Sequence, residues 1–302
     1  SFFMKKFDIV ILTDSRYLDP KKINDYVKNV LTEDGLVQQA LEKLNLKVLR
    51  LAWDDPNFEW SSTQYVLFRT TWDYFDRFDE FSEWLSKVCK KTKLLNSETI
   101  IRWNLDKHYL KDLEIKGVHC TPTLFIKTKC KKSLAQLHKQ TNWEETVLKP
   151  VISGAARHTY KLNSKNLYLY ENIFQELNDK EAFMLQPFQN NIIEKGELSL
   201  IVIDGTFTHA VLKIAKKGDF RVQDDFGGSV HNYTPTPEEI EFAERAVRAC
   251  QFEPIYARVD MFTDNDNQLA VSELELVEPE LWFRHNPEAA IKLAEAIKKL
   301  FN

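Results

Sequence analysis

Glycine is scarce in this chain of 302 residues, which contains eight. Each glycine is therefore expected where the backbone needs a positive φ or comes close to a ligand. The glycine-rich phosphate loops GxxxxGKS/T and GxGxxG are both absent from the sequence. The chain therefore contains neither a Walker loop nor the fingerprint of a dinucleotide-binding domain.

Cysteine is also rare, and its four residues are widely spaced. Cys89, Cys120, Cys130 and Cys250 form no CxxC pair, which favours a reduced, cytoplasmic setting. No apolar run approaches the roughly 18 residues of a membrane span, and no secretory h-region is visible, so no membrane partner is expected. We expect the three residues before Met4 to be an expression remnant, and they take no part in the argument on the fold.

An excess of positive charge is lacking as well, because the formal net charge is -4. Nucleic-acid-binding proteins usually show a basic face, so no nucleic-acid partner is expected. The seven histidines lack a GxSxG partner, and no HExxH metal motif occurs. This favours chemistry by positioning and electrostatics over covalent catalysis by a side chain. With 43% hydrophobic and 28% charged residues, the chain is typical of a soluble globular protein of two or three domains.

The first hundred residues alternate strand and helix patterns. Short apolar runs predict strands over 7–14, 47–53 and 64–71, and helical spacing predicts helices over 35–46 and 78–91. Alternation of this kind favours an α/β layer with a parallel sheet.

Ligand groups gather at the carboxyl ends of the strands in such a sheet. Arg69 and Asp73 follow the third predicted strand, so they are candidates to hold a substrate carboxylate or amine. The same segment contains three aromatic residues, Trp72, Tyr74 and Phe75. A role for them as core and cover residues is at least as well supported as a role in binding substrate.

From about residue 100 the pattern changes to α+β. A helix is predicted over 104–117 with Gly117 at its end, followed by strands separated by short helices. A hairpin over 196–215 turns at Asp204-Gly205, and a helix over 236–250 begins with a threonine cap and a proline. A second hairpin and a closing amphipathic helix are predicted over 255–276 and 287–300.

The second hairpin gathers acidic residues within apolar strands. Side chains alternate faces along a strand, so Glu273 and Glu275 point to one side, about 7 Å apart. Arg258 and Asp260 likewise share a face of the partner strand. If the two faces coincide, three carboxylates converge and suit Mg²⁺ or Mn²⁺. The alternative is a solvated outer face of the sheet, which the apolar flanks make less natural.

Several basic residues are candidates for binding phosphate. Lys149 leaves a strand beside the small-residue turn 153–156, whose backbone amides would add donors, although the pattern alone favours a surface lysine at a strand end. Arg221 lies in a polar segment and either grips a carboxylate or phosphoryl group or belongs to a charged loop. Lys107 is ordinary on a helix face, and Lys213 on the first hairpin could equally be solvated.

Taken in order, eight features resemble the ATP-grasp superfamily. They are Lys107, LKP (148–150), SGAA (153–156), MLQPF (184–188), GELSL (196–200), FRVQDDFGG (220–228), ARVD (257–260) and SELELVEP (272–279). Within the superfamily the chain is most similar to bacterial glutathione synthetases and to the ligases that close the ring of D-cycloserine. The segment RTTWDY (69–74) resembles the latter group, and the likeness spans about residues 7 to 300.

The resemblance implies an ATP-grasp fold of three parts. An N-terminal α/β domain on the substrate side, residues 4–100, precedes two α+β subdomains that clasp ATP. The central subdomain covers residues 101–190, and the C-terminal subdomain with the metal site covers 191–302.

The resemblance also implies a role for individual residues. Lys107 and Lys149 would contact the ATP phosphates, under a covering loop that includes Ser153 and Gly154. Gln186 and Phe188 would lie along the adenine, and Glu197 would hold the ribose hydroxyls. Substrate-binding roles would belong to Arg69, Asp73 and Arg221, and catalytic roles to Arg221, Arg258 and Lys149. The metal ligands that it implies are Asp260, Glu273 and Glu275.

One position departs from the family pattern. Many relatives have E-x-N where this chain has Glu273-Leu274-Glu275. Asparagine is a neutral oxygen ligand, so Glu275 adds a negative charge to the metal site. Glu278 and Glu280 lie beyond the strand, and no metal role is expected for them.

The activity that the resemblance implies is ATP-dependent ligation of a carboxylate to an amine. A small amino-acid-like or peptide substrate would be activated as an acyl phosphate with Mg²⁺, or Mn²⁺, as the metal. The alternatives are an ATP-grasp phosphotransferase, a peptide-modifying ligase and a non-catalytic nucleotide-binding module. The expected partners are a small-molecule carboxylate and amine, and a homodimer is the base-rate expectation for the oligomeric state.

Overall fold

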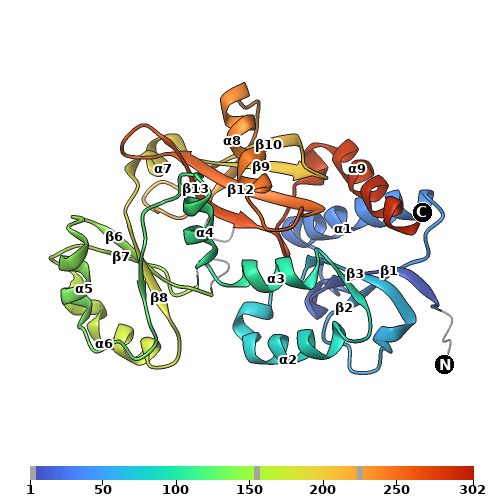
Figure 1. Ribbon diagram of the computed structural model, residues 1–302, viewed down its shortest axis with the longest axis horizontal. Coiled ribbons are helices and arrows are strands. Elements are labelled where there is room, and N and C mark those ends of the chain that lie inside the picture. Colours follow the sequence, from blue (N-terminus) through green and yellow to red (C-terminus); the bar gives the residue numbers. More distant parts are fainter. Residues whose placement is uncertain (1–4, 153–156, 223–226) are drawn as a thin grey trace.

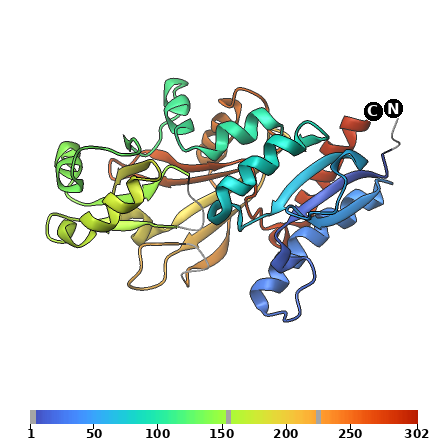
Figure 2. The same cartoon turned by 90° about the horizontal axis from the view of Figure 1, so that it is seen from below.

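The computed structural model describes residues 5–152, 157–222 and 227–302. In these ranges the strands form three sheets, each accompanied by helices (Figure 1). The predicted phosphate-covering residues Ser153 and Gly154 lie outside the described residues. The C-terminus lies at the end of the molecule that contains the first sheet (Figures 1 and 2).

The first sheet is parallel, with the strand order β2-β1-β3-β4. Its strands are β1 (Phe7–Thr13), β2 (Val48–Ala52), β3 (Thr63–Thr70) and β4 (Lys93–Leu95), and its helices are α1 (Asp25–Lys43) and α2 (Phe78–Val88). The predicted parallel α/β layer is therefore confirmed. Helix α1 begins ten residues before the predicted start at residue 35, because the Asn24 side chain accepts the Val27 amide and caps the helix there.

The helix predicted over 104–117 is two helices, α3 (Glu98–Leu105) and α4 (Tyr109–Ile115). The prediction of one continuous helix was wrong because Asp106 turns the chain: its carboxylate accepts the His108 amide at 2.8 Å. Lys107 lies in this turn rather than on a helix face, and its amide donates to the Val151 carbonyl at 3.2 Å. Gly117, at φ +85°, follows the end of α4 as predicted.

The second sheet is antiparallel, with the order β5-β8-β6-β7. Its strands are β5 (Leu124–Ile126), β6 (Thr146–Pro150), β7 (Tyr160–Leu162) and β8 (Phe183–Pro187), and its helices are α5 (Leu134–Thr141) and α6 (Leu167–Asn178). Leu137 of α5 and Phe174 of α6 pack with Leu148 and Phe183 of the sheet in one apolar core. This part forms the end of the molecule opposite the first sheet (Figure 1).

The third sheet is antiparallel, with the order β11-β10-β9-β12-β13. Its strands are β9 (Glu197–Ile203), β10 (Thr206–Ile214), β11 (Ser229–Tyr233), β12 (Tyr256–Thr263) and β13 (Leu269–Glu275); α7 (Asn190–Lys195), α8 (Pro237–Arg248) and α9 (Pro287–Lys298) accompany it. Both predicted hairpins are confirmed. The first turns at Asp204 and Gly205, which both have positive φ, as a two-residue hairpin turn requires.

Alternating side chains of β9 bind two different layers to the third sheet. Leu198, Leu200 and Val202 pack against α8 and α4 on one face. Ile201 and Ile203 pack against α9 and α1 on the other. Helices α1 and α9 lie side by side in Figures 1 and 2, so the first and third sheets share a core.

Each predicted domain, 4–100, 101–190 and 191–302, contains one sheet. Helix α4, however, packs into the core of the third sheet rather than the second, and the domain boundaries stay a prediction. Short 3₁₀ helices complete the described structure at Ser15–Tyr17, Trp60–Ser62, Tyr74–Arg77, Phe283–His285 and Lys299–Phe301. Of the helices described, none combines the length and the apolar character needed to cross a membrane.

Candidate active site

A cleft of about 660 Å³ is lined by residues from all three sheets and their connections. Trp72 follows the first sheet, Lys149 belongs to the second, and Asp260 belongs to the third. The predicted site residues that line this cleft are Lys107, Lys149, Gln186, Phe188, Glu197, Arg221, Arg258, Asp260, Glu273 and Glu275.

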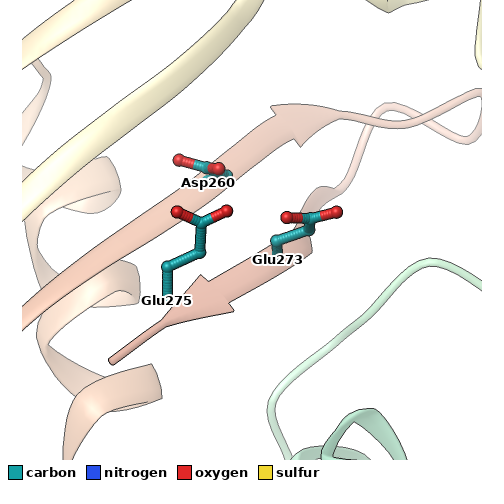
Figure 3. A group of neighbouring side chains, drawn as sticks. All are labelled: Asp260, Glu273 and Glu275. Carbon is teal, nitrogen blue, oxygen red and sulfur yellow. The ribbon is translucent and has the colours of Figure 1, made fainter. Parts of the chain in front are cut away.

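Three of these residues form a compact carboxylate cluster on the β12–β13 hairpin (Figure 3). Asp260 is paired with Glu273, and Arg258 with Glu275, in the strand register. One carboxylate oxygen from each of Asp260, Glu273 and Glu275 lies within 4.8 Å of the others. Among the residues described, this is the group that could hold a metal ion, and its hard oxygen donors suit Mg²⁺ or Mn²⁺.

Asp260 is held rigidly within this cluster. Its carboxylate accepts hydrogen bonds from the Ser199 hydroxyl at 2.6 Å and from Arg258 Nη2 at 2.8 Å. Burial would raise the pKa of Asp260, but Arg258 and Lys213 outweigh that effect and hold it below its ordinary value. Asp260 is therefore an ionised carboxylate in a fixed orientation.

Four cationic side chains surround the carboxylate cluster. Lys107 Nζ lies 3.2 Å and Lys149 Nζ 3.8 Å from Glu273. Arg258 lies 2.9 Å from Glu275. These distances explain why acidic residues two positions apart are tolerated on one half-buried face, because each negative charge has a nearby positive partner.

Lys213 is the fourth cation, and the sequence did not distinguish it from a solvated residue. Its Nζ lies 2.7 Å from Glu197 and 3.4 Å from Asp260. Lys213 and Glu197 are direct cross-strand partners in the β9–β10 register. Opposite charges facing each other across the predicted hairpin were the signal that could have identified this pair.

The two glutamates of β13 differ in their protonation. Burial alone would raise the pKa of Glu273, but Lys107 and Lys149 lower it below its ordinary value. Burial raises the pKa of Glu275 well above its ordinary value, and the charges of Asp260 and Glu273 add to this against the opposing effect of Arg258. The cluster thus pairs an ionised carboxylate with one that readily holds a proton.

The two lysines share one acidic partner, which leaves room for a further anion. Burial lowers the pKa of Lys149, and the neighbouring charge of Lys107 adds to this effect. For Lys107, burial is outweighed by Glu273 and Glu275, so its pKa rises. Among the described residues, Glu273 is the carboxylate that lies within 4.0 Å of both Lys107 Nζ and Lys149 Nζ. Lys107 and Lys149 together therefore suit a polyanion such as a triphosphate.

Gln186 and Phe188 lie at the other end of the cleft. The Gln186 side chain donates to Thr123 Oγ1 at 3.0 Å, and the Phe188 amide donates to the Glu145 carbonyl at 2.9 Å. Lys161 Nζ lies 3.8 Å from the centroid of the Phe188 ring. The rings of Phe188 and Phe220 form an edge contact at 6.1 Å, so this end of the cleft has apolar walls suited to a flat ring.

Arg221 lines the cleft as predicted, and its guanidinium lies 3.0 Å from Asp219. The structure does not bring Arg69 or Asp73 into the cleft. Arg69 is fully buried, where it donates to the Pro279 carbonyl at 2.8 Å and covers the Tyr256 ring. Asp73 accepts from the Trp53 indole at 2.9 Å and pairs with Arg77. Both side chains have structural contacts here, and their role in binding substrate stays a prediction.

The cleft also contains residues that the sequence did not single out as functional. Tyr74 donates to Glu278 Oε1 at 3.2 Å, and the Trp72 indole donates to the Glu278 carbonyl at 2.9 Å. All three residues line the cleft. Nothing in the local sequence signalled this, because Glu278 follows the last strand at a point where strand periodicity no longer applies.

Two family models match successive parts of the chain. The N-terminal domain of D-cycloserine synthetase DcsG matches residues 9–96, and the ATP-grasp domain of prokaryotic glutathione synthetase matches residues 113–255. The glutathione synthetase match places an ATP-grasp domain within residues 113–255 of this chain. The similarity expected from the sequence motifs is thereby confirmed.

Similar proteins agree with this assignment. The cycloserine biosynthesis protein DcsG of Streptomyces lavendulae is 28% identical over 273 residues, which cover 81% of this chain and 86% of that protein. The crystal structure of D-cycloserine synthetase DcsG superimposes with a TM-score of 0.84 at 22% identity, covering 97% of this chain and 99% of that one.

More distant structures share the same ATP-grasp fold. D-alanine–D-alanine ligase from Bacillus anthracis, complexed with ATP, has a TM-score of 0.64 at 12% identity and covers 97% of this chain and 96% of its own. The ATP-grasp ligase PsnB, complexed with a precursor peptide and AMPPNP, has a TM-score of 0.61 at 15% identity and covers 100% and 99%. The predicted ATP-grasp fold is confirmed.

Proposed function

We propose that this protein is an ATP-dependent ligase that joins the carboxylate of a small amino-acid-like substrate to an amine. The observation that carries the proposal is the wall of the cleft where Lys107 and Lys149 face the cluster of Asp260, Glu273 and Glu275. The likeness to a cycloserine biosynthesis protein and to D-alanine–D-alanine ligase supports a substrate of this size.

ATP fits the cleft in two respects. Lys107 and Lys149 share one carboxylate, that of Glu273. A triphosphate beside the two ammonium groups would neutralise the positive charge that Glu273 alone leaves unpaired. Phe188 and Phe220 supply an apolar end for adenine, and Glu197 supplies a carboxylate for the ribose hydroxyls. We infer that Gln186 and Phe188 flank the base, as the family resemblance implies.

The carboxylate cluster fits Mg²⁺, or Mn²⁺, as the metal. Asp260, Glu273 and Glu275 would hold it, because their oxygens already lie within 4.8 Å of one another. When bound, the metal neutralises charge that develops as a phosphoryl group is transferred. Ser199 and Arg258 keep the Asp260 carboxylate oriented toward the cluster.

The chemistry follows from charge placement rather than from a nucleophilic side chain. The substrate carboxylate attacks the γ-phosphate of ATP, which gives an acyl phosphate and ADP. The amine then attacks the acyl carbon, a C–N bond forms, and phosphate leaves. Lys149, Arg221 and Arg258 are the cations that would stabilise the negative charge that develops in these steps.

The test is ADP release from Mg²⁺-ATP in the presence of paired amino acids and dipeptides, with product masses measured alongside. A ligase gives ADP only when both an acid and an amine are present, and a product mass equal to their sum less water. A phosphorylated product would identify a phosphotransferase instead. Absence of ADP release with the whole panel would indicate a nucleotide-binding module.

The matched variants are Glu273→Gln and Glu241→Gln. Loss of Glu273 removes a metal ligand and the partner of both lysines, so ADP release should fall by at least a hundredfold. Glu241 lies on the exposed side of α8 in a pair with Arg248, so its loss should leave turnover unchanged. Near-normal turnover of Glu273→Gln would contradict the metal assignment.

A further inference from the structure

A three-ring wall closes the cleft on the side of the first sheet. It consists of Tyr17, Tyr26 and Trp72, whose ring centroids lie 6.0 to 6.3 Å apart. All three line the cleft. The wall faces the segment after β13, because the Trp72 indole donates to the Glu278 carbonyl at 2.9 Å. Aromatic rings attract cations, and the guanidinium of Arg16 already lies 5.2 Å from the centroid of the Tyr17 ring.

Glu278 lies against this wall and differs from the other carboxylates of the cleft. Glu197, Asp260, Glu273, Glu275 and Glu280 each have a lysine or arginine nitrogen within 4.0 Å. In the described ranges of the chain, Glu278 has no such cation. Asp76, the remaining acidic residue of the lining, is exposed to solvent. Glu278 is therefore a half-buried carboxylate that the charges of Lys107 and Arg258 reach only from beyond 4.0 Å.

One oxygen of Glu278 is also without a hydrogen bond. Tyr74 donates to Oε1 at 3.2 Å, whereas Oε2 is buried and has no partner among the described residues. Burial raises the pKa of Glu278 to about 7, although Tyr74 and the charges of Lys107 and Arg258 act against this. A buried carboxylate oxygen without a donor is unfavourable, so a ligand that brought a positively charged donor would be stabilised here.

We infer that Glu278, Tyr74 and the three-ring wall bind the ammonium group of the substrate amine. The inference rests on the proposed ligase function and names the class of its second substrate, a small primary amine that enters as its ammonium form. An ammonium group offers three N–H donors and a full charge, which suits both the free Glu278 oxygen and the aromatic faces. The site shares the cleft with the carboxylate cluster, because Glu278, Glu273 and Glu275 all line it.

The test is saturation-transfer NMR with n-propylammonium as the probe and 1-propanol as its neutral match. It needs neither turnover nor an identified substrate. The wild-type protein should bind n-propylammonium at least tenfold more tightly than 1-propanol. Glu278→Gln should lose this preference. Glu280→Gln should keep it, because the Glu280 carboxylate is already paired with Arg284 at 2.6 Å.

Two results would overturn the inference. One is equal binding of n-propylammonium and 1-propanol by the wild-type protein. The other is an unchanged preference in Glu278→Gln. If Glu278→Gln does not fold, Glu278→Asp takes its place. This variant retains the charge, so it should keep the preference for the cation at several-fold lower affinity. Loss of the preference in a folded Glu278→Asp would also contradict the inference. The NMR experiment contains no ATP, so a negative NMR result would not contradict the proposed ligase activity. Conversely, a lack of ADP release with ATP would not contradict a positive NMR result.

Discussion

At the scale of single residues, the site depends on how charges are paired. Glu273 and Glu275 are two positions apart on one strand, yet their pKa values shift in opposite directions. The lysines lie beside Glu273, whereas Glu275 has Arg258 but also faces Asp260. Glu275 is also the position where the family resemblance implies asparagine, so its carboxylate distinguishes this candidate metal site.

Replacing that residue tests what the added charge does. Glu275→Asn keeps an oxygen ligand but replaces a carboxylate that can ionise on metal binding with a neutral amide, so the affinity for Mg²⁺ should fall by about tenfold. Isothermal titration of Mg²⁺ in the presence of a non-hydrolysable ATP analogue measures this. The control is Glu241→Gln, which removes an exposed carboxylate far from the cluster. Equal Mg²⁺ affinity in wild type and Glu275→Asn would show that Glu275 is not a ligand.

Glu278 should make the stability of the free protein depend on pH. Its pKa is about 7 in the folded protein against an ordinary value of 4.5. Between these values the folded protein keeps a proton that the unfolded chain has lost, so the free energy of unfolding falls as the pH rises. Between pH 5 and 8, Glu278 should lower the free energy of unfolding by up to about 3 kcal/mol, and screening by solvent reduces this amount. Glu278→Gln should remove this contribution. Urea unfolding at both pH values measures it, and identical pH dependence in both proteins would argue against a buried, unpaired carboxylate.

At the scale of secondary-structure elements, the β12–β13 hairpin positions the site. Period-two alternation placed Asp260, Glu273 and Glu275 on one face, and the register of the two strands confirms that face. The same rule could not place Arg69. Its strand β3 is buried on both faces over Val66–Thr70, so alternation gives no indication of which side faces a ligand.

Lys107 shows a second limit of sequence patterns. A helical pattern runs through residues 104–117, but the side chain of Asp106 bonds the His108 amide and interrupts the helix. Local side-chain bonds of this kind compete with helix formation. The interruption brings Lys107 toward Glu273, so the feature that the helical pattern missed is part of the candidate site. The roles expected of Ser153 and Gly154 fall outside the described residues and stay predictions.

Asn96 joins two of the sheets, and its loss should weaken that junction. Its side-chain amide donates to the carbonyls of Tyr256 and Leu276 at 3.0 and 2.7 Å, and its oxygen accepts the Ile255 amide at 2.7 Å. Asn96→Ala leaves these buried groups unsatisfied and should lower the free energy of unfolding by about 3 kcal/mol or more. Chemical denaturation measures this against Asn57→Ala at an exposed position. A loss below about 1 kcal/mol would contradict the proposed junction.

At the scale of the whole molecule, the cleft forms where the three sheets meet. The first and third sheets share a core through α1 and α9, while the second sheet contributes Lys149 and the Phe188 end of the cleft. A nucleotide bound across the cleft would contact both the second and the third sheets. Binding should therefore stabilise the protein as a whole.

Lys149→Ala tests this link between binding and stability. The variant should bind a Mg²⁺–AMPPNP complex at least tenfold more weakly, since a phosphate contact is lost. In thermal unfolding, a ligand at a hundred times its Kd adds about 2.7 kcal/mol, so the increase in Tm should shrink in the variant. Without nucleotide its Tm should differ little from wild type, because Lys107 remains 3.2 Å from the shared partner Glu273. The control is Lys87→Ala, which removes an exposed lysine paired with Glu83. An unchanged nucleotide affinity in Lys149→Ala would count against the phosphate role.

The most direct test of the central claim follows an oxygen atom through the reaction. Once a pair of substrates supports ADP release, the acid is supplied with ¹⁸O in its carboxylate and the released phosphate is analysed by mass spectrometry. Activation as an acyl phosphate transfers one ¹⁸O atom to phosphate for each ADP formed. Phosphate without label, formed at the same rate as ADP, would contradict the account.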